Sequence, residues 1–421
     1  MPAALLLPGL FFALACAPAP AGNGRSVLLI TLDTTRADRI GVYGGESAST
    51  PSIDALARRG VLFERAYASI PVTLPSHTTI LTGLYPHEHG VRDNGVYRVP
   101  DELTTLAEVL RDRDYRTGAF VSAHVLHSQY RIDQGFTVFD DEMVEPLRVQ
   151  SPVPRGAKLP EHTKRWIDTW SRPYQRRAET TVERALEWLG ADDGTDAPFF
   201  CWVHLFDPHL SYEPPAPYDT LFGDPYDGPV DGTGESFHDL AKELQGRIPR
   251  KHLDRMISLY DGEISYADEW IGRLLAAVPD STLVVFTADH GEALGEHGQF
   301  FEHQMTIYEE TMRVPLVVAG PGVPGAGVRR TEPAGSVDVF PTVLGLLGLR
   351  GGGDVSGVDL FGPGATEPRP LYGETRAALT AVPTPTGYRG VRENGWALIR
   401  EIVKPDRIQK EQLFHTVDDP A

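Results

Sequence analysis

The chain has 421 residues, 41% hydrophobic and 23% charged, a balance that is ordinary for a globular protein with a sizeable core. The formal net charge of −19 comes without a compensating basic block, so we exclude a nucleic-acid polyanion as the main partner. A small anionic ligand would need a local positive centre, supplied by a metal ion or by His and Arg side chains.

The N-terminal residues form an apolar run that ends in the small residues Ala15-Cys16-Ala17. The run is too short to span a bilayer, and we expect residues 1–22 to be a secretory signal. Cys16 follows Ala13-Leu14-Ala15, which resembles a bacterial lipoprotein cleavage box, so a lipid on Cys16 is the alternative and would attach the protein to a membrane. The expected location is periplasmic, outer-membrane or extracellular. Without this segment Cys201 is the only cysteine, which excludes an internal disulfide.

Apolar runs alternate with amphipathic segments between residues 25 and 349, which indicates one α/β domain with a mainly parallel sheet flanked by helices. The pattern predicts strands at 26–32, 118–123, 198–206, 281–288 and 314–320, and helices at 51–60, 103–110, 178–189, 256–278 and 336–347. The Gly/Pro-rich residues 350–370 indicate a linker, and 371–421 a small C-terminal α+β subdomain. Residues 142–177 predict an insertion over the sheet, and 218–250 are poorly patterned.

A threonine-rich stretch, 72–83, places a secondary alcohol just ahead of a predicted short helix. Pro75 suits a first helical turn, and Gly83 ends the helix. The free N–H groups and positive dipole end of this helix would lie beside the Thr73 hydroxyl and favour a tetrahedral oxyanion such as sulfate or phosphate. The alternative is a threonine-rich turn that only caps a structural helix.

Acidic and imidazole side chains follow the predicted strands. Asp33 follows strand 26–32 and the pair Asp289-His290 follows strand 281–288. The carboxyl ends of strands border the ligand crevice in open α/β sheets, although Asp33 could instead only cap the next turn. With Thr73, two carboxylates, one imidazole and one alcohol oxygen predict the ligands of a divalent cation, which would activate the alcohol as a nucleophile.

In order and spacing, these motifs resemble the sulfatase family of the alkaline-phosphatase-like superfamily. The segments that carry the resemblance are Ile30 to Asp38, Pro51 to Ala57, Thr73 to His77, Leu81 to Gly83, His204 to His209, Thr287 to Glu292, Tyr308 to Pro315 and Leu413 to Pro420. The resemblance covers the chain from about residue 26 to its end. It implies an alkaline-phosphatase-like or sulfatase-like central sheet flanked by helices.

The resemblance also implies a metal site and a nucleophile. Asp33, Asp289 and His290 fall at metal-binding positions, and Thr73 falls at the position of the nucleophile beside the metal. The residue types do not distinguish among Ca, Mg, Mn and Zn as the divalent cation.

Further residues fall at positions that serve the ester in the family. Asn94, His209 and His303 match residues that contact the ester or protonate the leaving group. His77 takes the position of an arginine that usually steadies the modified nucleophile. His124 lies near the place of a lysine and a histidine, so we expect it to contact substrate.

Two departures from the family pattern concern the chemistry. Typical sulfatases carry Cys or Ser at the Thr73 position, converted to formylglycine, and threonine should not yield that aldehyde, so no formylglycine is expected. Thr34 replaces a second metal-binding acid. Superfamily relatives that cleave or transfer phosphate esters use an unmodified Thr beside the metal, so this chain combines a sulfatase frame with a phosphoesterase-like nucleophile.

We therefore expect a metal-dependent hydrolase that cleaves a sulfate or phosphate ester through Thr73, while a histidine protonates the leaving alcohol. The substrate would be a small, glycan-linked or lipid-linked anionic ester. Two alternatives stay open. One is a phosphodiesterase or phosphotransferase of the same superfamily, with a second metal bound by Asp207, His209 and His303. The other is a non-catalytic member that binds sulfated glycans or cell-wall polymer.

Overall fold

The structure is a computed structural model, which describes residues 24–146, 173–191, 194–376, 387–404 and 407–416. The predicted signal segment 1–22, with Cys16, and residues 147–172 of the predicted insertion lie outside the described residues. Within the described ranges, no helix combines the length and the hydrophobicity that a membrane span requires.

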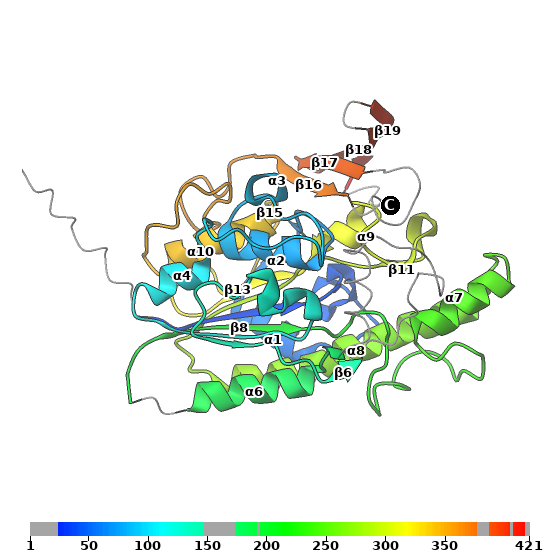
Figure 1. Ribbon diagram of the computed structural model, residues 1–421, viewed down its shortest axis with the longest axis horizontal. Coiled ribbons are helices and arrows are strands. Elements are labelled where there is room, and N and C mark those ends of the chain that lie inside the picture. The colour runs from blue at the N-terminus through cyan, green and yellow to red at the C-terminus, as the bar shows by residue number, and fades with distance from the viewer. Residues whose placement is uncertain (1–23, 147–172, 192–193, 377–386, 405–406, 417–421) are drawn as a thin grey trace, which may run out of the picture.

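An eight-stranded sheet forms the centre of the fold (Figure 1). Its strands, in spatial order, are β14 (Val328–Arg330), β2 (Gly60–Phe63), β13 (Leu316–Ala319), β9 (Leu283–Ala288), β1 (Val27–Leu32), β8 (Phe199–Leu205), β4 (Arg116–Phe120) and β5 (Val138–Asp140). Strands β9, β1, β8, β4 and β5 run parallel, and β13 is antiparallel to both of its neighbours. The α/β fold with a mainly parallel sheet is confirmed.

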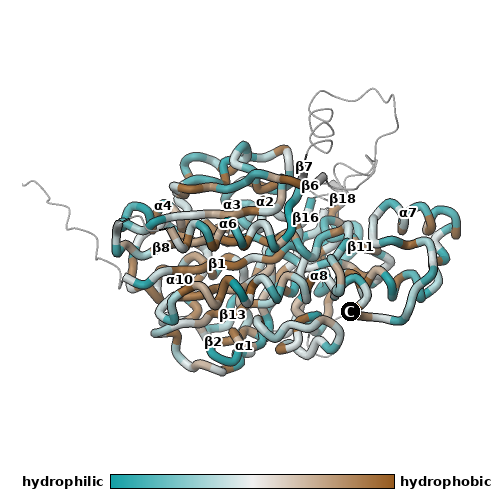
Figure 2. Tube along the Cα trace, turned by 90° about the horizontal axis from the view of Figure 1, so that it is seen from below, coloured by the Kyte–Doolittle hydropathy of each residue, from teal (hydrophilic) through white to brown (hydrophobic). Residues whose placement is uncertain are grey.

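Strand β1 shows why the sheet is buried on both faces. Val27 and Leu29 pack into one hydrophobic cluster. Leu28 and Ile30 pack into the other, because successive side chains of a strand point to opposite faces. Figure 2 accordingly shows hydrophobic residues concentrated along the central strands. The odd-numbered residues of β1 therefore face the cluster that holds helix α2 (Thr73–Thr82).

Helices cover both faces of the sheet in three layers (Figure 1). One face carries α2, α4 (Leu106–Arg111) and α10 (Val339–Leu346), with the short α3 (Pro86–His89) nearby. The opposite face carries α1 (Pro51–Arg59), α6 (Ala178–Gly190) and α8 (Arg250–Ala277). Each of the five predicted strands and five predicted helices has a counterpart within a few residues, except that α8 begins six residues earlier than predicted.

The sequence patterns missed two features of these helices. Helix α7 (Gly234–Glu243) lies in the poorly patterned stretch 218–250, for which the sequence predicted no element, and Thr233 caps it by accepting from the Ser236 N–H. Helix α2 begins at Thr73 itself rather than after it, and its N-cap residue, Val72, makes no side-chain cap. The expectation that Thr73 precedes the helix was therefore wrong by one turn.

Smaller sheets surround the central one. The C-terminal sheet is antiparallel and consists of β16 (Leu371–Thr375), β17 (Gly387–Glu393), β18 (Trp396–Lys404) and β19 (Arg407–His415). The other sheets pair β3 (Ala66–Tyr67) with β12 (Arg313–Val314) and β15 (Ala334–Gly335), β10 (Ala293–Leu294) with β11 (Phe300–Glu302), and β6 (Glu145–Pro146) with β7 (Pro173–Gln175). The short helix α9 (Glu309–Met312) directly precedes β12 in the chain.

The C-terminal sheet and the segment before it pack closely on the main body. The Glu374 N–H donates to the Ser69 carbonyl, and Arg392 donates to the carbonyl of Ile307. In the expected linker 350–370, the N–H groups of Ser356 and Gly357 donate to the carbonyl of Gly83. The assignment of 350–370 as a linker and of 371–421 as a separate subdomain stays a prediction.

We expect Gly83, which ends α2, to be sensitive to substitution. It has φ of 70°, and an added Cβ would lie 3.2 Å from Phe340 and 3.3 Å from Val355. Gly90 is a matched control, since its φ is 80° and an added Cβ would meet nothing within 4 Å. Gly90→Ala should lower the free energy of unfolding by about 1–2 kcal/mol, and Gly83→Ala by about 1–3 kcal/mol more. Equal losses in urea denaturation would contradict this packing.

Candidate functional site

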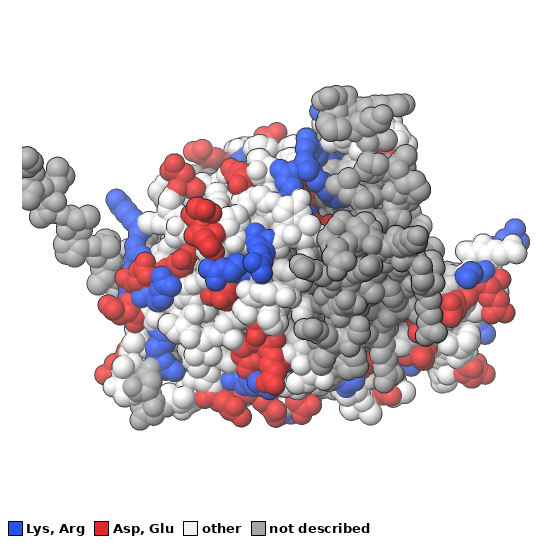
Figure 3. All heavy atoms as spheres, viewed as in Figure 1, with Lys and Arg blue, Asp and Glu red and all other residues white. Residues whose placement is uncertain are grey.

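Two buried acids mark the site. Most charged side chains lie at the surface, where acidic and basic groups are interspersed on the face seen in Figure 3. Asp33 and Asp289, in contrast, each have 0% of their surface exposed. Burial raises the pKa of both carboxyls, and the neighbouring charge of Asp33 raises the pKa of Asp289 further. Two facing buried carboxyls are unfavourable unless a cation or a proton neutralises them.

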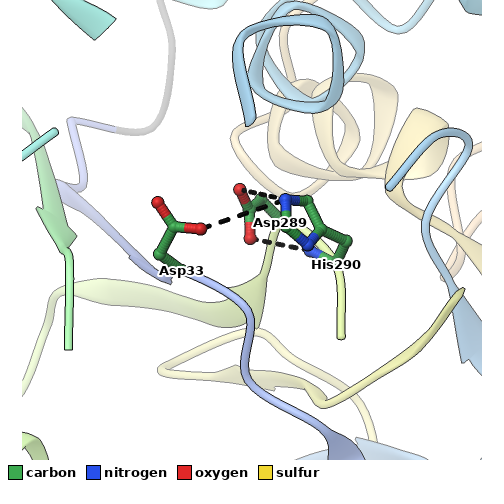
Figure 4. A group of neighbouring side chains, drawn as sticks. All are labelled: Asp33, Asp289 and His290. Atoms are coloured by element: carbon green, nitrogen blue, oxygen red, sulfur yellow. Dashed lines mark hydrogen bonds and ion pairs between the residues drawn. The ribbon is translucent and has the colours of Figure 1, made fainter. Parts of the chain in front are cut away.

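The parallel strands bring these acids together with one imidazole. Asp33 follows β1, and Asp289 and His290 follow the adjacent β9, where the Asp289 N–H donates to the Leu32 carbonyl. One ligand atom from each of the three side chains lies within 4.8 Å of the others (Figure 4). The Nε2 atom of His290 is 3.3 Å from Asp289 Oδ2 and 3.9 Å from Asp33 Oδ1.

The unpaired atoms of this triad fit a divalent cation. Both carboxylate oxygens of Asp33, Oδ2 of Asp289 and Nε2 of His290 are buried without a hydrogen-bond partner in the described part of the chain. The other atoms are used, because Asp289 Oδ1 accepts from the His290 N–H and His290 Nδ1 lies 3.0 Å from the Gly291 carbonyl. A proton on Nδ1 leaves Nε2 as a bare lone pair facing the acids. Four such acceptors match the preference of divalent cations.

Thr34 shapes the loop that carries Asp33. Its φ of 48° is unusual for a β-branched residue, and its N–H donates to Asp289 Oδ1 at 3.2 Å. Its hydroxyl donates to the Pro208 carbonyl. Thr34 therefore ties the loops after three strands together, at the position where the resemblance places a second metal-binding acid.

Helix α2 meets the site at its first turn. Thr73 is only 2% exposed, and the Ser76 hydroxyl donates to the Asp289 carbonyl at 2.6 Å. The Leu74 N–H donates to Asn94 Oδ1 at 2.9 Å, Ser76 N–H bonds within the helix, and Pro75 has no N–H. The expected row of free helix N–H groups is thus largely occupied, and the Asn94 amide stands at the helix start.

His77 is neutral and buried. Its Nδ1 lies 2.8 Å from the Thr73 carbonyl, and its Nε2 lies 3.0 Å from the Thr31 hydroxyl. Burial, with a smaller effect of His204, holds the pKa of this imidazole well below its usual value. His77 therefore brings no positive charge to the position where the resemblance places an arginine.

Two further histidines lie beside the triad, His303 stacked on His290 and His209 edge-on to His303. The ring of His303 lies 4.5 Å from that of His290, and the ring of His209 lies 5.3 Å from that of His303. His209 Nδ1 is 2.7 Å from the Leu210 carbonyl, and His303 Nδ1 is 3.2 Å from Glu292 Oε1. Nε2 is thus the ring nitrogen that each histidine keeps for a ligand. Burial lowers the pKa of His303 and lowers that of His209 to about 4, while the charge of Asp33 opposes both shifts.

The structure adds residues that the sequence patterns did not assign. His204 Nε2 lies 3.5 Å from Asp33 Oδ2, while its Nδ1 accepts from the Ser122 N–H at 3.4 Å. Glu292 is fully buried behind His303. The strand pattern held a signal for His204, because it lies on the same face of β8 as the buried Trp202 and beside Thr31 of β1.

Two further predicted site residues have contacts of their own. His124 contacts Gln129 at 3.0 Å and the ring of His127 at 5.5 Å, among other contacts, and its expected contact with substrate stays a prediction. Asp207 Oδ2 accepts from the Ala178 N–H at the start of α6. Within the described ranges, the triad is the only group of three or more such side chains that could hold a metal ion. A preformed second site from Asp207, His209 and His303 is therefore not present there.

Comparisons with known proteins place this geometry in a family. A family model described as Sulfatase matches residues 25–349. The ulvan-active sulfatase of Formosa agariphila is 25% identical over 414 residues, which cover 94% of this chain and 75% of that protein.

Solved structures share the fold. One, of a protein in complex with its substrate D-glucosamine-2-N,6-O-disulfate, has a TM-score of 0.72 and 20% identity and covers 94% of this chain and 92% of that one. Another, the phosphonate monoester hydrolase of Agrobacterium radiobacter, has a TM-score of 0.70 and 21% identity, with coverage of 94% and 90%. Since the family model spans most of the sequence, the chain belongs to the sulfatase family.

Proposed function

We propose that this protein is a metal-dependent hydrolase that cleaves a sulfate or phosphate ester with Thr73 as the nucleophile. The observation that carries the proposal is the set of unpaired buried ligand atoms on Asp33, Asp289 and His290, next to the helix that begins at Thr73. The names of similar proteins support this class of substrate. They include an ulvan-active sulfatase, a protein whose substrate is a disulfated glucosamine, and a phosphonate monoester hydrolase. A sulfated or phosphorylated glycan is therefore the substrate class that we favour.

The residues of the site would contribute to catalysis in different ways. A divalent cation bound by Asp33, Asp289 and His290 would lower the pKa of a neighbouring hydroxyl and offset the negative charge of the ester. With Oδ1 of Asn94 engaged by the helix, its Nδ2 is the donor that remains for an ester oxygen. Asp33, Asp289 and His290 are fully buried, which strengthens the electrostatic interactions that they make.

The reaction would proceed in two steps. The Thr73 oxygen would form a bond to sulfur or phosphorus and release its hydroxyl proton. The bond to the leaving alcohol would break as its oxygen takes a proton from Nε2 of His303 or His209, in the doubly protonated form of the ring, so the proton lost by Thr73 equals the proton gained by the alcohol. Water then attacks the Thr73 ester and releases sulfate or phosphate. Glu292 Oε1 lies 3.2 Å from Nδ1 of His303, so this carboxyl would stabilise the doubly protonated ring that gives up its Nε2 proton.

Thr73→Ala should lower kcat by at least about 10³-fold, because the chain loses its nucleophile. Thr73→Ser, which keeps a hydroxyl, should retain turnover within about 10-fold. The measurement compares aryl sulfate, phosphate monoester, phosphodiester and phosphonate monoester substrates for both variants and the wild type. Wild-type turnover in Thr73→Ala would contradict the assignment, and turnover of the phosphodiester alone would favour the phosphodiesterase alternative.

Cation binding should stabilise the protein through the triad. Saturation at 100 times Kd should raise the free energy of unfolding by about 2.7 kcal/mol, measured by thermal unfolding after chelation and re-addition of Ca²⁺, Mg²⁺, Mn²⁺ or Zn²⁺. Asp33→Asn and Asp289→Asn should abolish this increase.

A matched control for these variants is Asp261→Asn. Asp261 is another buried acid, but it pairs with Arg39 at 2.5 Å. Its replacement should lower the stability of the protein without cation while the cation-induced increase persists. An equal loss of the increase in all three variants would mean that the triad is not the binding site.

Glu292→Gln should impair the protein most on esters with poor leaving groups. A proton donor contributes little when the leaving group is a stable phenolate and much when it is an alkoxide. We expect about a 100-fold loss of kcat for an alkyl ester and less than about 5-fold for a nitrophenyl ester. Tyr212→Phe, which removes the hydrogen bond to Oε2 of Glu292, should have a smaller effect that does not depend on the leaving group. A uniform loss for Glu292→Gln would contradict its role.

A further inference from the structure

A buried line of polar atoms leads from the sheet to the first residue of α2. Trp202 of β8 donates from Nε1 to the Thr31 hydroxyl of β1 at 3.0 Å. The same hydroxyl lies 3.0 Å from Nε2 of His77, and Nδ1 of His77 lies 2.8 Å from the Thr73 carbonyl. All four residues are at most 2% exposed, so water does not offer these atoms other partners.

The chemistry of the two ends fixes the direction of every hydrogen bond between them. An indole N–H can only donate, and a carbonyl oxygen can only accept. The Thr31 oxygen therefore accepts from Trp202 and has its own hydrogen to give, which goes to Nε2 of His77. Nδ1 of His77 then carries the ring hydrogen and donates it to the Thr73 carbonyl. Every donor in this line of hydrogen bonds then faces an acceptor.

The other neutral tautomer of the His77 ring leaves atoms unpaired. With the hydrogen on Nε2, the bare Nδ1 would face the carbonyl oxygen of Thr73, and two acceptors would meet at 2.8 Å. Nδ1 of His77 also lies 3.8 Å from Oδ2 of Asp289, a second acceptor, so a hydrogen on Nδ1 suits both neighbours of that nitrogen. Of the two neutral tautomers, only the Nδ1–H form pairs the complete line.

We propose that His77 is a positioning residue, which Trp202 and Thr31 lock in the Nδ1–H tautomer so that its ring holds the Thr73 carbonyl and fixes the nucleophile. This inference rests on the proposed function of Thr73. The first residues of a helix ordinarily fray. Here the Leu74 N–H is held by Asn94 and the Ser76 hydroxyl is held on the Asp289 carbonyl, and His77 adds a third restraint at Thr73 itself.

The geometry therefore gives the position of the expected arginine a different task. A guanidinium would add positive charge beside the nucleophile. This imidazole instead connects the first residue of α2 to strands β1 and β8 by hydrogen bonds. The ring of His77 also packs 5.3 Å from that of Trp202 and 4.9 Å from that of His204, so it is held on its faces as well as at its nitrogens.

The tautomer can be observed directly in the wild-type protein. Two-bond ¹H–¹⁵N correlation spectra of protein labelled with ¹⁵N-histidine distinguish Nδ1–H, Nε2–H and doubly protonated rings, and His77→Gln assigns the signal. We expect the Nδ1–H pattern at pH 7.5, with and without Mg²⁺. An Nε2–H or doubly protonated His77 would overturn the inference, whether or not the protein turns over any ester.

Thr31→Val and Thr31→Ser then test the link to the nucleophile. Valine has the same shape as threonine but removes the hydroxyl, so the His77 signal should change and kcat should fall about 10–50-fold with KM within about 3-fold. Serine keeps the hydroxyl and should restore the wild-type signal and most of kcat. An unchanged kcat in Thr31→Val would overturn the positioning role. Should Thr73→Ala keep full turnover, the proposed function fails instead, and the spectrum still decides the tautomer.

Discussion

The arrangement depends on two carboxylates that the sheet forces together out of water. Asp33 and Asp289 end adjacent parallel strands, so the register of β1 and β9 sets their separation before any side chain adjusts. Their unpaired oxygens repel each other in a buried setting, and a cation is the partner that relieves this repulsion without a proton. Two buried carboxylates that repel each other lower the stability of a fold without a cation, and such unfavourable pairs are typical of functional sites.

The surrounding imidazoles divide according to what their nitrogens contact. His77 contacts the Thr73 carbonyl and the Thr31 hydroxyl, while His204 accepts from the Ser122 N–H and lies 3.5 Å from Asp33. In His209 and His303, Nδ1 is the engaged nitrogen, and the ring of His303 lies 4.5 Å from that of His290. The contacts of the four imidazoles therefore distinguish two rings that have neighbours at both nitrogens from two rings whose Nε2 can face a ligand.

Much of the fold and part of the site could be predicted from the sequence. Strands 26–32 and 281–288 are continuous apolar runs that end in acids, and parallel packing then places Asp33 near Asp289. The start of α2 at Thr73 was not predictable, because Val72 offers no side-chain cap and tertiary contacts from Asn94 and Asp289 stabilise the first turn instead. The tautomer of His77 depends on pairing between residues far apart in sequence, which no local pattern encodes.

The central claim is that the triad holds one divalent cation beside Thr73. The most direct measurement is an anomalous difference map from crystals of the protein grown with Mn²⁺. We expect one strong peak among the described residues, within coordination distance of Asp33, Asp289 and His290 and next to the start of α2. A map with no peak there, or with the strongest peak on other side chains, would contradict it.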